Sequence, residues 1–168
     1  MKQSSKIFVG MDVHKESIDI TLAEQDGEVG RFGTVGGDRV SLVKAVRKLT
    51  SRGRALVFVY EAGPCGFWIY RELTALGHAC LVVSPSLIPR RSGDHVKTDR
   101  RDSENLARLA RAGELTGIRG DVLEDLLDPL SSFVGPRYCG HDRMRRSISS
   151  FEIVRLASEL ASPRSTIT

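Results

Sequence analysis

Residues 6–117 alternate between short apolar runs and longer amphipathic segments, and this alternation restricts the chain to α/β architectures. Three strands are predicted first, at 6–12, 17–23 and 28–35, with a hairpin-type turn before the third. Helices and strands then take turns: a helix at 38–50 capped by Asp38, a strand at 54–61, a helix at 66–76, a strand at 79–83 and a helix at 99–112. Three antiparallel strands followed by βα units predict a mixed sheet covered by helices.

The second predicted strand, residues 17–23, alternates strictly between apolar and polar side chains. Isoleucine and leucine occupy one face, and Ser17, Asp19 and Thr21 occupy the other. An antiparallel strand with one solvent-facing side has this pattern. We therefore expect the polar face of this strand to be half-exposed.

Carboxylates stand at the ends of two apolar strands and at the start of the last helix. Asp12 lies in the first strand, Glu61 closes the fourth, and Asp99 and Asp102 are three apart on one helix face. Each acid alone has an ordinary explanation as a cap, an ion-pair partner or a surface residue. Together they indicate magnesium-dependent phosphodiester chemistry, because Mg²⁺ prefers oxygen ligands and buried carboxylates need a compensating positive charge.

Charge and cysteine content narrow the class of protein. Residues 1–117 hold 18 Lys and Arg against 14 Asp and Glu, and so carry the whole net charge of +4. This favours a polyanion-binding surface there, or simply a solvated basic face. The three cysteines, Cys65, Cys80 and Cys139, lack the spacing of a disulfide framework or zinc site, and Cys65 and Cys80 are expected to pack as small apolar residues. Without an apolar run of membrane-spanning length, we expect a cytoplasmic protein with no membrane partner.

The predicted element order resembles that of ribonuclease-H-like domains. In those domains the first strand lies centrally beside the fourth, which would bring Asp12 and Glu61 to neighbouring strand ends. An actin-like or sugar-kinase-type ATPase domain is an alternative, but the residues that follow Asp12 include no glycine to cradle a phosphate before Gly27. A non-catalytic remnant that binds nucleic acid is the other alternative.

Four stretches carry a more specific resemblance: FVGMDVHK at residues 8–15, YEAGP at 60–64, VSPSLIP at 83–89 and GDHVKTDRRD at 93–102. Their residues and spacing closely resemble the N-terminal domain of DEDD transposases, the insertion-sequence group related to the Piv DNA invertase. The resemblance covers about residues 6–117, and its last stretch is the most specific.

The resemblance implies a RuvC-like, ribonuclease-H-type domain that binds two Mg²⁺ ions, or Mn²⁺ in their place, through Asp12, Glu61, Asp99 and Asp102. It also implies DNA strand cleavage and exchange in DNA transposition, directed in family members by a structured bridge RNA. Homo-oligomers or complexes with a full-length transposase are further expected partners. Five basic residues would be natural phosphate contacts near the metals, or else a solvated basic loop: Arg90, Arg91, Lys97, Arg100 and Arg101.

Residues 118–168 have a different character from the rest of the chain. They contain no lysine and ten Ser and Thr, and only 121–130 and 151–160 suggest helices. We expect a domain at 1–117 followed by an irregular, atypical tail. Family members are longer and carry a second catalytic domain with a nucleophilic serine. The expectation is therefore a truncated or frame-disrupted transposase that is not competent alone.

Overall fold

A computed structural model describes residues 5–63, 66–89 and 99–118, with the backbone alone at Phe67 and at 99–101. Within these residues five strands, three α-helices and one short 3-10 helix follow one another: β1 (Ile7–Val13), β2 (Ser17–Glu24), β3 (Val29–Gly36), α1 (Arg39–Thr50), β4 (Leu56–Glu61), α2 (Phe67–Ala75), β5 (Ala79–Val83), η1 (Pro85–Leu87) and α3 (Asp99–Ala112). Apart from η1, the element order is the one predicted. The helices suggested at 121–130 and 151–160 lie outside the described residues.

The strands form one mixed sheet in the order β3-β2-β1-β4-β5. β1 pairs antiparallel with β2, and β2 pairs antiparallel with β3, as expected of a meander. β1 is parallel to β4, and β4 is parallel to β5. The first strand therefore lies in the centre of the sheet beside the fourth, which confirms the predicted ribonuclease-H-like strand order.

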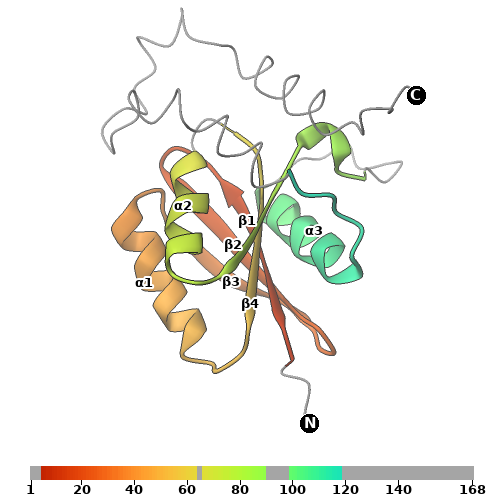
Figure 1. Cartoon of the computed structure of the whole chain (residues 1–168), viewed down its shortest axis with the longest axis horizontal. Helices are drawn as coiled ribbons and strands as arrows, with labels where there is room; N and C mark the ends of the chain where they lie inside the picture. Colours follow the sequence, from red (N-terminus) through yellow and green to blue (C-terminus); the bar gives the residue numbers. More distant parts are fainter. Residues whose placement is uncertain (1–4, 64–65, 90–98, 119–168) are drawn as a thin grey trace, which may run out of the picture.

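Helices cover both faces of this sheet (Figure 1). α1 and α2 lie on one face, where Leu42, Val46 and Leu73 pack in a single core with alternate residues of β1. α3 lies on the other face, where Leu106 packs against Val59 of β4. Alternate residues of each strand point to opposite faces, so the parity of a strand position decides which helix its side chain meets.

The polar face of β2 is not half-exposed, which corrects the expectation from its alternation. Asp19 and Thr21 are 4% and 2% exposed. The reason is α3, which packs over this face and whose Ser103 side-chain oxygen lies 2.9 Å from that of Thr21. Alternation in β2 thus separates two buried faces, one apolar and one polar.

α1 begins where the sequence predicts. The Asp38 carboxylate accepts hydrogen bonds from the backbone N–H and the hydroxyl of Ser41, at 3.0 and 2.6 Å. These hydrogen bonds hold the pKa of Asp38 below its usual value. The Arg39 side chain then joins α1 to α2 through an ion pair with Glu72, with 2.6 Å between Nε and Oε2.

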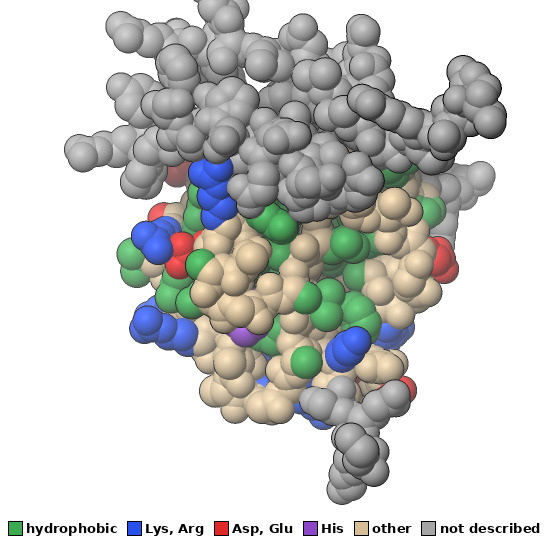
Figure 2. Space-filling view, in the orientation of Figure 1, with side chains coloured by type: hydrophobic (Ala, Val, Ile, Leu, Met, Phe, Trp, Pro, Cys, Tyr) green, Lys and Arg blue, Asp and Glu red, His purple; other side chains and the backbone are tan. Residues whose placement is uncertain are grey.

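A groove with basic and apolar walls lies between α1 and α2, lined by Arg39, Val40, Val43, Lys44, Arg47, Glu72 and Leu76. Figure 2 shows basic and apolar side chains side by side on the α1 side of the molecule. This groove is on the sheet face opposite α3. No helix in the described part of the chain has the length and apolar character needed to cross a membrane.

Candidate metal centre

Asp12 and Glu61 lie at the same edge of the sheet, on adjacent parallel strands. The last paired residues of β1 and β4 are Met11 and Tyr60, and each acid follows one residue later. Neighbouring strands are about 4.8 Å apart. The prediction that these two acids reach neighbouring strand ends is therefore confirmed.

Both acids are on the face of the sheet that α3 covers. Asp12 is two residues from Gly10, over which the α3 backbone passes, and Glu61 is two residues from Val59, which packs against Leu106. Residues two apart in a strand share a face. Asp12 is half-buried, with 18% of its side chain exposed, and Glu61 is exposed.

The direction of α3 follows from contacts at its two ends. Near its end, Arg111 donates to the backbone oxygens of Glu24, the last residue of β2, and of Gly27 in the turn that follows, at 3.2 and 2.9 Å. Glu24 pairs with Ile7 at the start of β1. α3 therefore runs antiparallel to β1, and its first turn lies toward the end of β1 that carries Asp12.

Asp102 belongs to that first turn and is half-buried. It directly precedes Ser103, which is completely buried against β2. Asp99 begins the helix, but its side chain lies outside the described residues. The convergence of all four predicted acids thus stays a prediction, while three of them are placed at one end of the α3 face.

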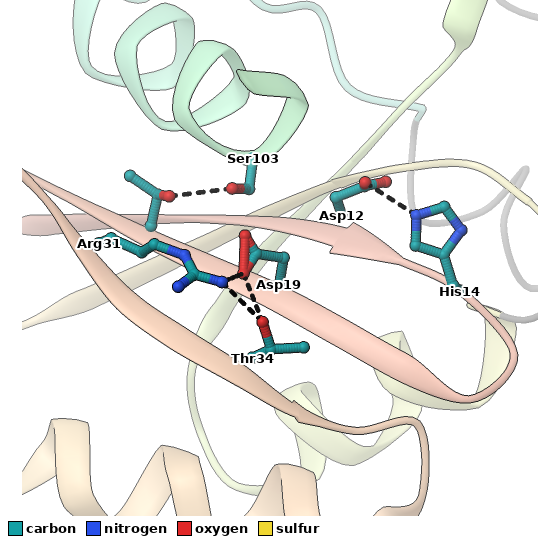
Figure 3. A network of polar contacts seen from close by, with 7 residues as sticks. Asp12, His14, Asp19, Arg31, Thr34 and Ser103 are labelled. Carbon is teal, nitrogen blue, oxygen red and sulfur yellow. Dashed lines mark hydrogen bonds and ion pairs between the residues drawn. The ribbon is translucent and has the colours of Figure 1, made fainter. Parts of the chain in front are cut away.

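His14 adds a contact at this edge. Its Nε2 lies 2.9 Å from Oδ2 of Asp12, and about half of its side chain is exposed. Figure 3 shows the two side chains facing each other just past the end of β1. His14 therefore contacts the first of the four predicted acids directly.

Asp19 is a further carboxylate beside Asp12, and its position within a strand gave no sign of this in the sequence. It lies on β2 as the paired residue of Asp12, so the two side chains are on one face. Arg31 forms an ion pair with its Oδ1 at 2.8 Å, and Thr34 donates to the same oxygen at 2.9 Å. The hairpin between β1 and β2 could have indicated the pairing, because Asp12 and Asp19 are equidistant from its turn.

The donor chemistry of the site fits a hard divalent cation, since Asp12, Glu61 and Asp102 offer carboxylate oxygens. One buried oxygen, Oδ2 of Asp19, also has no hydrogen-bond donor among the described residues. Within 5–63, 66–89 and 99–118, however, no three His, Cys, Asp or Glu side chains lie close enough together to hold a metal ion. A complete site would need a further donor or bound water.

The structure does not describe the side chains of the five predicted phosphate contacts. Arg90, Arg91 and Lys97 are outside the described residues, and the side chains of Arg100 and Arg101 are as well. Their role as nucleic-acid contacts stays a prediction. The start of α3 nevertheless places the backbone of the last two in the helical turn that carries Asp102.

Comparison with known proteins decides the family. A family model, DEDD_Tnp_IS110, described as a transposase, matches residues 9–133, which is most of the 168-residue chain. The chain belongs to the DEDD transposase family. The match extends past residue 117, where the sequence predicts a domain boundary, and the division into a 1–117 domain and a tail stays a prediction.

Two curated relatives of this DEDD transposase chain are much longer than the part that matches it. "Putative transposase y4qE" of Sinorhizobium fredii is 49% identical over 113 residues, which are 66% of this chain and 29% of that protein. "Transposase for insertion sequence element IS1533" of Leptospira borgpetersenii is 40% identical over 108 residues, or 64% and 31%. The chain spans less than a third of the length of these curated relatives.

Among solved structures, the catalytic core domain of BIV integrase is 12% identical to this DEDD transposase chain. Its TM-score is 0.34, and the match covers 98% of this chain and 88% of that one. The fold assignment depends on the strand order of the sheet and not on this neighbour.

Proposed function

We propose that this segment supplies the divalent-cation-dependent DNA strand cleavage and exchange step of a DEDD transposase. One observation carries the proposal: Asp12 and Glu61 end adjacent parallel strands on the sheet face that α3 covers, and the first turn of α3 carries Asp102. Asp12, Glu61, Asp102 and Asp99 would hold two Mg²⁺ ions, or Mn²⁺. Such ions activate the attacking oxygen and stabilise the leaving oxygen of a phosphodiester.

Different residues of the chain would hold the cations, orient a carboxylate and bind flanking phosphates. The carboxylates on β1, β4 and α3 come from rigid elements, so they would hold the cations, and through them a scissile phosphate, in a fixed position. His14 contacts Asp12 and would restrict the orientation of its carboxylate. Arg90, Arg91, Lys97, Arg100 and Arg101 would bind flanking phosphates.

The binding partners are also part of the proposal. DNA is the substrate expected of a transposase, and a structured guide RNA and an oligomeric assembly are proposed from the family resemblance. Because the chain spans less than a third of its curated relatives, the complete recombination reaction is proposed for a protein or assembly that includes further segments. A cytoplasmic location fits this assignment and is proposed with it.

A plasmid-nicking assay tests the proposal. The chain alone is not expected to complete transposition, but with supercoiled DNA and Mg²⁺ or Mn²⁺ it should still nick the plasmid. EDTA should abolish the nicking, and Asp12→Asn and Glu61→Gln should each lower the rate by about 100-fold, or about 2.7 kcal/mol of transition-state stabilisation. Asp26→Asn, the same chemical change in an exposed turn, is the matched control and should nick at the parental rate.

Equal nicking by Asp12→Asn and the unaltered chain would contradict the proposal. DNA binding without any nicking would instead favour the alternative function, a nucleic-acid-binding module without catalysis.

A further inference from the structure

Asp19 is a buried carboxylate that is not among the four metal ligands proposed above. Its side chain is 5% exposed, yet only one of its two oxygens is engaged. Oδ1 accepts hydrogen bonds from Nη2 of Arg31 and from the hydroxyl of Thr34. No donor in the described residues reaches Oδ2. A buried charged oxygen without a partner is unfavourable, so this atom calls for a ligand.

A β-bulge brings Arg31 to the face of the sheet that carries Asp19 and Thr34. Thr34 is the paired residue of Asp19, whereas the register shifts after Ile20, so that Arg31 is paired with Thr21. Residues three apart in a regular strand point to opposite faces, and the extra residue of the bulge restores Arg31 to the α3 side. This local irregularity positions a cation against one oxygen of Asp19 only.

The other oxygen points to the side of the sheet that α3 covers, which is also the side of Asp12 (Figure 3). Figure 3 shows Oδ2 of Asp19 pointing away from Arg31 and Thr34, toward the side of the sheet where α3 lies. Asp19 is directly opposite Asp12 across the β1–β2 pair, where Cβ atoms are about 4.5–5.5 Å apart. Like charges in opposed positions repel, so the pair favours an additional cation between or beside them.

We propose that Asp19 is an outer carboxylate of the cation site, whose Oδ2 accepts a hydrogen bond from a water on a divalent ion held by Asp12. This proposal rests on the function proposed above. Mg²⁺ lies about 2.1 Å from its oxygen ligands and usually keeps several waters. With a water-to-carboxylate hydrogen bond of about 2.7 Å, an outer oxygen lies roughly 4–5 Å from the ion, a distance that suits an adjacent strand.

Arg31 sets the strength of this contact. Its Nη2 is shared between Asp19 and Thr34 and engages a single carboxylate oxygen, rather than both as in a bidentate pair. The guanidinium thus offsets part of the Asp19 charge and leaves Oδ2 available to the ion. Removal of Arg31 should therefore have the opposite effect on cation affinity from removal of the Asp19 charge.

Titration calorimetry with Mn²⁺ on the full 168-residue chain tests the proposal, with each variant checked for folding by circular dichroism in EDTA. Asp19→Asn keeps the size of the side chain and should weaken Mn²⁺ binding by about tenfold or more, as outer partners of metal ligands do. Asp26→Asn, in an exposed turn, should bind Mn²⁺ like the unaltered chain. Arg31→Gln should bind Mn²⁺ several-fold more tightly.

The outcomes separate the two proposals. If Glu61→Gln lowers Mn²⁺ affinity while Asp19→Asn leaves it unchanged, the outer role of Asp19 is overturned and the proposed function stands. If the unaltered chain binds no Mn²⁺, or Glu61→Gln binds it equally well, the cation site itself is overturned. Should Asp19→Asn fail to fold, Arg31→Gln decides, because unchanged or weaker binding in that variant would overturn the role of Asp19.

Discussion

Gly10 determines how closely α3 can approach the centre of the sheet. A Cβ at this position would overlap the backbone oxygen of Ser103 and lie 2.6 Å from the backbone nitrogen of Ala107. Both atoms belong to a helical backbone, which can yield only if the whole helix moves. Gly10→Ala should therefore lower the free energy of unfolding by about 1–3 kcal/mol in urea titrations.

The same substitution in β3 is the control. A Cβ at Gly30 would meet nothing within 4 Å, so Gly30→Ala should stay within about 0.5 kcal/mol of the parent. Because α3 carries Asp102, the displaced helix of Gly10→Ala should also weaken Mn²⁺ binding. A Gly10→Ala protein as stable as Gly30→Ala would show that α3 does not press on β1.

Individual residues differ in how far the sequence could predict their place in the site. Asp12 and Glu61 were predictable, because acids that end apolar strands interrupt a pattern that is otherwise uniform. Asp19 was not, since an acid in an alternating strand looks like an ordinary solvent-facing residue. Its burial depends on α3, which begins 80 residues later, and on a bulge that aims Arg31 at it.

Among the elements, β3 depends on one strained position. Gly33 lies at the bulge with φ of +133°, a conformation that residues with a side chain rarely adopt. Gly33→Ala should therefore cost about 1–3 kcal/mol of stability. Since the bulge positions Arg31, the substitution should also disturb the ion pair with Asp19.

Urea titration of Gly33→Ala beside Gly30→Ala checks this expectation within a single strand. No atom lies within 4 Å of a Cβ built at either position, so a difference between the two variants reports backbone strain and not crowding. Equal stabilities would show that β3 accepts the bulge without strain.

The sequence predicts where helices and strands begin and end better than it predicts which of their faces are buried. α3 spans the range predicted for it, because Leu106 and Leu109 repeat at helical spacing and Gly113 follows the last turn. β2 was predicted as a strand for an equally local reason, its period of two. Which of its faces meets solvent was predicted wrongly, because that depends on helix packing between distant parts of the chain.

The stability of the whole molecule should fall in alkaline solution. Burial raises the pKa of the Cys80 thiol to about 12 and raises the pKa of the Tyr60 phenol well above its usual value. In the unfolded chain the thiol ionises above about pH 9 and the phenol above about pH 10, whereas both groups stay protonated in the folded chain. The unfolded state then binds fewer protons, so each group can remove about 1.4 kcal/mol of stability per pH unit until its folded pKa is reached.

Urea titrations between pH 8 and 11 measure this decline. Cys80→Ala removes one of the two groups, so the difference in stability between the unaltered chain and this variant should shrink as the pH rises through 9. A constant difference over the whole range would contradict the raised pKa of Cys80. The thiol should also resist alkylation at pH 8, because the thiolate is the reactive form.

One further contact of the sheet holds the end of the described residues near the candidate metal centre. After α3 the chain returns to β5: Gly117 bridges to Val83, and the N–H of Ile118 donates to the oxygen of Val82 at 2.8 Å. Val83 is itself the paired residue of Glu61. Ile118 is thus held about two strand spacings, roughly 10 Å, from Glu61. A group attached to the chain at this point would have a high effective concentration at the carboxylates.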